Sequence, residues 1–234
     1  MSGHAPRLVD NPSLRDRVGV FADRADAGRV LARMLAAQCD SNAIVLGIPA
    51  GGVPVAAVIA RELALPLDVA VVSKITLPWN TEAGYGAVAF DGSVLLNQAL
   101  VDRLELGADE ITDGIDRTRR KVLGRVRQLR GERPLPVSGD TPAVLVDDGL
   151  ASGFTMLCAV AALRNAGVRQ VTVAVPTGHG DAARRVAAEV EAVYCANLRG
   201  GFSFAVADAY RVWTDVTDDE VLTLLAARQQ PADG

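Results

Sequence analysis

Short runs of continuous apolar residues, each followed by a turn and then usually a helical stretch, constrain this fold more than any other feature of the sequence. The runs are AIVLGI (43–48), DVAVVS (68–73), AVLVDD (143–148), QVTVAVP (170–176) and AVYCAN (192–197). Runs without polar alternation are typical of strands buried on both faces, as in parallel sheets. The intervening segments have helical periodicity, so the sequence predicts an α/β fold with a doubly wound parallel sheet.

An insertion interrupts this pattern after the second predicted strand. LPWNTEAGYG (77–86) is polar and loop-like, whereas AVAFDGSVLLN (87–97) contains Asp91-Gly92, a preferred two-residue hairpin turn. We therefore expect an inserted β-hairpin flap, followed by a helix over residues 108–130. We also expect one domain over residues 1–234, with a core at about 43–196. The terminal segments, 1–42 and 197–234, should pack as helices and a small hood.

Composition and charge exclude several classes of protein. Half of the 234 residues are apolar, which argues against disorder, and the formal charge of -4 argues against a general nucleic-acid partner. The longest apolar runs are far shorter than a membrane span, so no membrane partner is expected. Cys39, Cys158 and Cys195 lack the spacing of a zinc site or a disulfide framework. We expect a cytoplasmic protein that binds small molecules.

The segment AVLVDDGLASGFT (143–155) carries the most specific chemistry. Asp147 and Asp148 follow a buried strand, where open α/β sheets bind ligands. Small residues then allow the backbone to wrap an anion at the start of a helix, and Ser152 and Thr155 add hydroxyl donors. Carboxylates accept hydrogen bonds from vicinal hydroxyls but repel phosphate. The segment therefore suits ribose 5-phosphate, with the diol at the acids and the phosphate at the loop.

Other interpretations of these motifs are weaker. A nucleoside-triphosphatase acid pair would need GxxxxGK[ST], which the sequence lacks, and GYGAVA (84–89) matches a dinucleotide pattern but leads into a hairpin. Asp147 and Asp148 could instead only hydrate a strand end, and PAGG (49–52) could be an ordinary turn. The small-residue loop after the acids favours the ligand-binding interpretation.

VLVDDGLASGFT resembles the phosphoribosyl diphosphate signature of type I phosphoribosyltransferases, and the order of elements over about residues 43–196 resembles that family's fold. IPAGGVPVA and YRVWTDVTDDEV are similar to a poorly characterised stand-alone branch. The resemblance implies that Asp147 and Asp148 bind the ribose hydroxyls and that the loop Ala151, Ser152, Gly153, Phe154 and Thr155 binds the 5-phosphate. It further implies that Pro49, Ala50, Gly51 and Gly52 face the diphosphate.

The same resemblance implies roles for the flap and for a metal ion. Lys74 would neutralise the diphosphate, and Glu82 of the flap would reach the acceptor when the flap closes. Mg²⁺ would bridge the diphosphate and the ribose hydroxyls with few protein ligands, so no protein metal ligand is assigned. Relatives usually have Arg where this chain has Ala50 and a basic residue at Ser73. Ala151 also stands where some purine-using members have an acidic residue.

These features lead to one expected activity and two alternatives. The expected activity transfers ribose 5-phosphate from phosphoribosyl diphosphate to an unidentified nitrogen acceptor, with Mg²⁺. Because Ala50 and Ser73 remove positive charge, the first alternative is a non-catalytic phosphoribosyl-ligand or nucleotide sensor. A hydrolase or phosphorylase acting on a ribose phosphate is the second. A homodimer is the family expectation.

Overall fold

A six-stranded parallel sheet forms the centre of the computed structural model, which describes residues 7–201 and 203–229, with the backbone alone for residues 81–83, 228 and 229. Its strand order is β1-β9-β8-β7-β2-β3. The strands are β1 (Leu8–Asp10), β2 (Ile44–Gly47), β3 (Leu67–Val69), β7 (Ala143–Val146), β8 (Val171–His179) and β9 (Ala192–Arg199). The two strands at the centre of the order, β7 and β8, are flanked by β2 and β9, so the predicted buried parallel sheet is confirmed.

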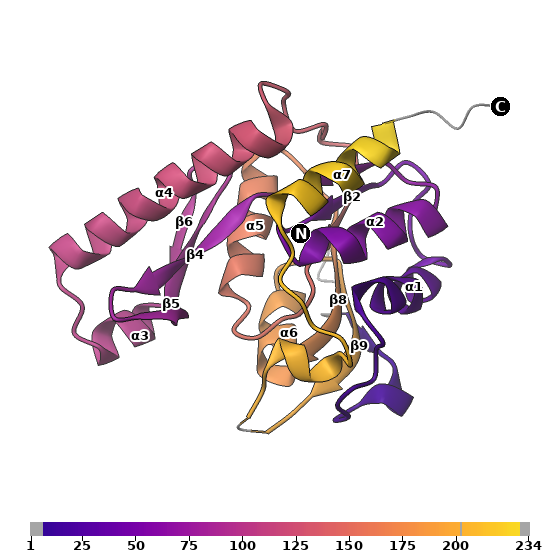
Figure 1. Ribbon diagram of the computed structural model, residues 1–234, viewed down its shortest axis with the longest axis horizontal. Coiled ribbons are helices and arrows are strands. Elements are labelled where there is room, and N and C mark those ends of the chain that lie inside the picture. The colour runs from indigo at the N-terminus through magenta and orange to yellow at the C-terminus, as the bar shows by residue number, and fades with distance from the viewer. Residues whose placement is uncertain (1–6, 202, 230–234) are drawn as a thin grey trace.

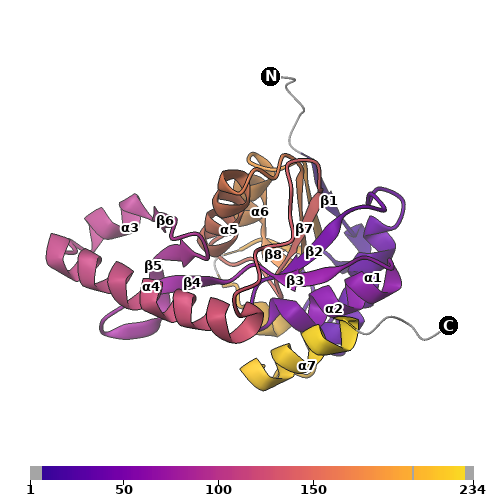
Figure 2. The same cartoon turned by 90° about the horizontal axis from the view of Figure 1, so that it is seen from above.

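Helices cover both faces of this sheet, as the doubly wound prediction requires (Figures 1 and 2). The helices α1 (Arg24–Leu35) and α2 (Gly52–Glu62) pack on one face, and α5 (Phe154–Asn165) and α6 (Gly180–Ala187) pack on the other. Each helix buries its apolar side against the continuous apolar strands. Asp23 caps α1 by accepting a hydrogen bond from the Asp26 N–H.

The N-terminal segment contains the expected helix, α1, but its residues 8–10 differ from the expectation that the segment packs as helices and hood. Leu8–Asp10 form β1, which pairs in parallel with β9 and places Leu8 opposite Val193. A short 3₁₀ helix, η1 (Pro12–Leu14), then leads to α1. Three residues are too few to show the alternation that indicates a strand. Leu8–Asp10 form a strand because the free edge of β9 offers backbone hydrogen-bond partners.

The inserted segment is a three-stranded antiparallel sheet in the order β4-β5-β6, and not a hairpin after a loop. Its strands are β4 (Val72–Leu77), β5 (Asn80–Ala89) and β6 (Val94–Leu96). The predicted hairpin forms around Asp91 and Gly92, but its loop has three residues, Phe90, Asp91 and Gly92, and not the predicted two, because Ala89 lies opposite Ser93. Gly92 has a left-handed φ of 88°, and Asp91 accepts a hydrogen bond from the Ser93 N–H. The predicted loop before it was wrong. It forms most of β5, because β4 turns back at Pro78–Trp79 and offers a pairing edge.

The predicted strand at 68–73 is divided between the two sheets. Leu67–Val69 pair with β2, and the chain then leaves the parallel sheet so that Val72 begins β4. An apolar run is buried in either sheet, so its hydrophobicity alone gives no sign of where the partner strand changes.

Two long helices complete the inserted region and the C-terminal part. After α3 (Gln98–Arg103), α4 (Ala108–Arg130) crosses the inserted sheet, and α7 (Asp218–Gln229) lies along α2 after a short 3₁₀ helix, η2 (Val206–Ala209). Val53, Ile75 and Tyr85 share a buried cluster with Val122 of α4 and Val221 of α7. The sequence TDDE (217–220) forms a capping box at the start of α7, through hydrogen bonds between Thr217 and Glu220. None of the helices within the described residues combines the length and apolarity needed to cross a bilayer.

Candidate functional site

The two predicted acids lie together where β7 ends. Both Asp147 and Asp148 are half-buried, and the Asp148 backbone N–H donates to Asp147 Oδ1 at 2.9 Å. β7 lies between β2 and β8, so Asp147 and Asp148 lie at the carboxyl ends of the central strands. Open α/β sheets bind ligands at this edge. The structure therefore places the pair where the sequence predicted.

A short loop of small residues joins this acid pair to α5. Gly153 has a φ of 83°, a left-handed conformation that favours glycine and turns the chain into the helix. The first backbone bond of α5 runs from the Leu157 N–H to the Gly153 carbonyl, so the preceding amides lie before the intrahelical ladder. Arg185 supports the loop from α6 by donating to the Ser152 carbonyl at 2.8 Å. Amides at a helix N-terminus form an anion-binding arrangement.

A cavity of about 370 Å³ lies over this loop and is large enough for a small ligand. One wall is Asp147 and the loop from Gly149 to Met156, and the opposite wall comes from the inserted sheet through Lys74, Gly84 and Gly86. Val206 of η2 closes a third side. All five predicted phosphate-loop residues, 151–155, therefore line one cavity together with Asp147 and Lys74.

The predicted diphosphate loop, Pro49–Gly52, contacts the acids from the neighbouring strand. A Cβ atom at Gly51 would overlap Asp148 Oδ2, and one at Gly52 would lie 2.6 Å from the Val146 carbonyl oxygen. Both positions therefore require glycine for close approach. The loop borders the acid pair but does not line the cavity described above. Arg125 of α4 supports it by donating to the Pro49 carbonyl at 3.2 Å.

One of the remaining predicted residues lines the cavity. Lys74 lies on β4 and lines the cavity, whereas the neighbouring Ser73 is buried. Ala50 is half-buried in the diphosphate loop. Glu82 belongs to β5, but its side chain lies outside the described part of the structure, so its predicted contact with an acceptor remains a prediction.

Burial and mutual repulsion alter the acidity of the pair. Burial raises the pKa of Asp147 well above its usual value, and the adjacent Asp148 carboxylate raises it further. Burial also raises the pKa of Asp148, although the Arg24 guanidinium opposes this effect. The folded protein thus holds protons at this pair at a higher pH than the unfolded chain does.

This raised pKa predicts that Asp147→Asn stabilises the ligand-free protein near neutral pH. As pH rises above the unfolded pKa of about 4, the unfolded chain ionises Asp147 first, so the wild type loses stability until the folded pKa is passed. The asparagine variant lacks this loss. Thermal melts should show a higher melting temperature for the variant at pH 7.5 and a smaller difference at pH 4. The control is Asp140→Asn, whose side chain is 89% exposed. An equal difference at both pH values would contradict the prediction.

Sequence reasoning missed several residues that contact the site. Arg24 at the start of α1 pairs with Asp148, and Tyr210 donates from its hydroxyl to the Asp148 carbonyl at 2.6 Å. Val206 packs so closely on the loop that a Cβ at Gly149 would overlap its side chain. For Tyr210 and Val206, the only feature of the sequence that could have indicated a role in the site was their place in an aromatic C-terminal segment. No feature of the sequence indicated such a role for Arg24.

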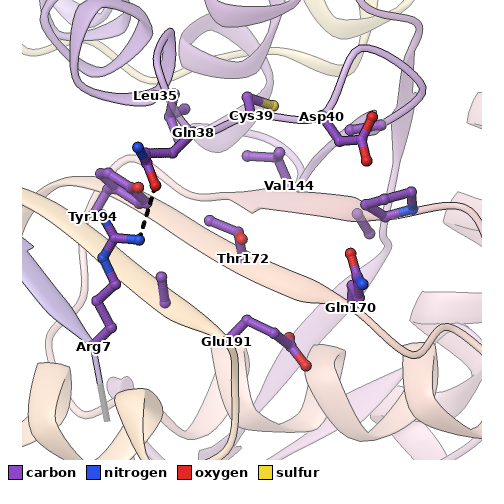
Figure 3. Close-up of a pocket in the computed structure, with 14 residues that line it drawn as sticks. Arg7, Leu35, Gln38, Cys39, Asp40, Val144, Gln170, Thr172, Glu191 and Tyr194 are labelled. Carbon is purple, nitrogen blue, oxygen red and sulfur yellow. Dashed lines mark hydrogen bonds between the residues drawn. The ribbon is translucent and has the colours of Figure 1, made fainter. Parts of the chain in front are cut away.

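A second cavity, of about 340 Å³, lies at the opposite edge of the sheet (Figure 3). It opens between the end of α1 and the amino ends of the strands, with Leu35, Val144, Thr172 and Tyr194 in its lining. Arg7 donates to the Gln38 side chain at its rim. This cavity lacks the paired acids and the glycine loops, so we assign the site to the carboxyl edge.

The fold and the site together define an α/β protein with paired acids and a helix-terminal anion loop at the carboxyl edge of a parallel sheet, the edge where open α/β sheets bind ligands. Residues 90–209 match the family model of the phosphoribosyl transferase domain. A Mycobacterium tuberculosis protein (strain H37Rv), provisionally named a phosphoribosyl transferase, is 40% identical over 208 residues. The alignment covers 88% of this chain and 46% of the relative, so the chain spans about half the length of the curated relatives it matches.

A solved structure gives the same result for the fold. The crystal structure of TT1426 from Thermus thermophilus is 34% identical, with a TM-score of 0.71, over 88% of this chain and 98% of that one. The chain therefore belongs to the type I phosphoribosyltransferase family, and the resemblance inferred from VLVDDGLASGFT is confirmed.

Proposed function

We propose that this chain binds phosphoribosyl diphosphate and transfers its ribose 5-phosphate group to a nitrogen acceptor, releasing diphosphate. The single observation that supports this most strongly is the cavity that joins Asp147 to the amide-rich loop at the start of α5. The loop 151–155 would bind the 5-phosphate, while Asp147 and Asp148 would accept hydrogen bonds from the vicinal ribose hydroxyls. The family match over residues 90–209 includes both elements.

The proposed reaction replaces one bond at the anomeric carbon. The acceptor nitrogen donates its lone pair to this carbon as the bond to the diphosphate oxygen breaks, and the diphosphate leaves with that electron pair. The acceptor nitrogen then loses a proton. Lys74 would neutralise charge on the leaving group, and the Pro49–Gly52 loop would approach it closely because Gly51 and Gly52 carry no side chains. Positioning and charge neutralisation would account for most of the rate.

Magnesium fits this site as an ion held mainly by the substrate. Within residues 7–201 and 203–229, no three His, Cys, Asp or Glu side chains are grouped to hold a metal ion on their own. Mg²⁺ commonly keeps several waters and binds through substrate phosphates. We propose that it would be held by diphosphate and ribose oxygens, where it would supply positive charge to the leaving group.

Closure of the inserted sheet would complete the site. Lys74, Gly84 and Gly86 already form one wall of the cavity, and Glu82 lies two residues before Gly84 on β5. We propose that Glu82 contacts the acceptor when this region moves inward, as lids commonly complete an active site and exclude water. A homodimer and a cytoplasmic location are part of the same proposal.

One observation favours the alternative of a non-catalytic ribosyl-phosphate sensor. Ala50 brings no charge to the diphosphate loop, and Ser73 is only 7% exposed, so neither can substitute for a basic side chain. Such a protein would keep the loop 151–155 and Asp147 but bind the diphosphate poorly.

Calorimetric titration followed by a product assay would distinguish these functions. Phosphoribosyl diphosphate with Mg²⁺, and ribose 5-phosphate alone, would each be titrated into the protein, and nitrogen bases would then be screened for diphosphate release. We expect micromolar binding of phosphoribosyl diphosphate and base-dependent release. Equal binding of ribose 5-phosphate without release would support the sensor. Sugar-phosphate cleavage without an added base would support a hydrolase or phosphorylase, and no binding of either ligand would refute the site.

A further inference from the structure

Arg24 is a charged partner of the acid pair that comes from a distant part of the chain. Its Nε and Nη2 atoms both donate to Asp148 Oδ2, at 3.0 and 2.9 Å. The Arg24 side chain is 10% exposed and that of Asp148 is 17% exposed, so the ion pair is largely shielded from water. The pair joins the start of α1 to the end of β7 across 124 residues of sequence.

The geometry of this ion pair constrains how Asp148 is presented. Both Arg24 donors bind Oδ2, so the ion pair leaves Oδ1, on the side of the neighbouring Asp147 carboxyl, as the oxygen to which a ribose hydroxyl would donate. Gly51 packs against the same Oδ2, which restricts rotation of the carboxylate from the other direction. A planar guanidinium fixes a carboxylate in a way that a single ammonium cannot.

The C-terminal segment holds Arg24 in this position. The Arg24 guanidinium lies 3.9 Å from the centre of the Trp213 ring, and its Nη1 donates to the Thr214 carbonyl at 2.8 Å. Tyr210 packs against Trp213, with ring centres 5.0 Å apart, and also donates to the Asp148 carbonyl. A cation against an aromatic face is favourable, and more so when shielded from water. Residues 210–214 therefore fix both partners of the ion pair.

We propose that Arg24 is a positioning residue for recognition of the ribose hydroxyls. It orients Asp148 toward the vicinal diol, with Trp213 as its support, while the loop 151–155 binds the phosphate independently. This inference rests on the proposed ribose 5-phosphate site. It predicts that loss of Arg24 weakens recognition of the hydroxyls and spares recognition of the phosphate.

The test compares ribose 5-phosphate with 2-deoxyribose 5-phosphate, which lacks one hydroxyl of the diol. Both would be titrated into the wild type, Arg24→Gln and Arg24→Lys, with inorganic phosphate as a third ligand. We expect the wild type to prefer the ribose form by about tenfold or more, as for a hydrogen bond to a charged group. In Arg24→Gln this preference should fall to about twofold or less, with unchanged phosphate affinity. Arg24→Lys should restore part of it.

A matched control and a second variant separate positioning from a general loss of structure. Arg29→Gln removes an arginine from the same helix whose side chain is 45% exposed and pairs with Asp26, so it should keep the wild-type preference. Trp213→Leu keeps Arg24 but removes its support, and should reduce the preference even if Arg24→Gln fails to fold. A wild-type preference retained in every folded Arg24 and Trp213 variant would overturn the inference. Failure of the wild type to bind either sugar phosphate would instead refute the proposed function.

Discussion

Replacing Asp147 and Asp148 together by asparagine is expected to reduce the affinity for phosphoribosyl diphosphate with Mg²⁺ by more than about 100-fold. Each carboxylate would accept a hydrogen bond from a ribose hydroxyl, and a hydrogen bond to a charged group contributes about 1.5–3 kcal/mol. Two such losses correspond to about 100-fold or more in affinity. The phosphate loop is unchanged in this variant, so inorganic phosphate should still bind.

The same titration needs a control for the loss of two negative charges. Asp113 and Asp116 lie on the exposed side of α4, so Asp113→Asn with Asp116→Asn removes equal charge away from the site. This control should bind as the wild type does. Retention of wild-type affinity by the Asp147→Asn, Asp148→Asn variant would show that the acids do not contact the ribose, and the site assignment would be wrong.

Gly51→Ala is expected to weaken phosphoribosyl diphosphate binding by about 10- to 100-fold, the effect of one lost hydrogen bond to a charged group, while the protein stays folded. The added methyl group would overlap Asp148 Oδ2, so the carboxylate must move away from Arg24 or the loop must move away from the acids. The obstructing atom belongs to a side chain, so the fold can adapt. Gly52→Ala would instead meet the backbone at the Val146 carbonyl and should lower the melting temperature more strongly.

Gly124→Ala provides the matched control for this substitution. Gly124 lies within α4, and a Cβ there has no heavy atom within 4 Å. The change should leave ligand affinity unaltered and raise stability by up to about 1 kcal/mol, because alanine favours a helix interior. Isothermal titration would measure affinity and thermal melts would measure stability. Equal affinities for Gly51→Ala and Gly124→Ala would contradict the role of close approach at Gly51.

The aromatic C-terminal segment shows how the structure changes an interpretation made from composition. Phe202, Phe204, Tyr210 and Trp213 gather in this segment of an aromatic-poor chain, and core packing is the default expectation for such residues. Tyr210 is indeed buried. Tyr210 and Trp213 also support Arg24 and Asp148, so their packing reaches the candidate site. Phe202, which belonged to the same predicted cluster, lies outside the described residues. The predicted hood remains a prediction.

The sequence by itself determined the parts of this protein that depend on neighbouring residues. Asp147, Asp148 and the loop 151–155 follow a buried strand directly, so their adjacency in the chain brings them together whenever β7 and α5 form. The same reasoning predicted α4 and the position of the hairpin at Asp91-Gly92, where local propensity decides the structure, although not the length of the hairpin loop.

Only the tertiary structure decided which distant segments meet. β1 exists because β9 offers a free edge, and the segment before the predicted hairpin forms a strand because β4 turns back beside it. Arg24 contacts Asp148 across 124 residues because α1 packs on the sheet with its first turn at the carboxyl edge. Such contacts depend on packing among elements that are separate in sequence, and local hydrophobic periodicity carries no information about them.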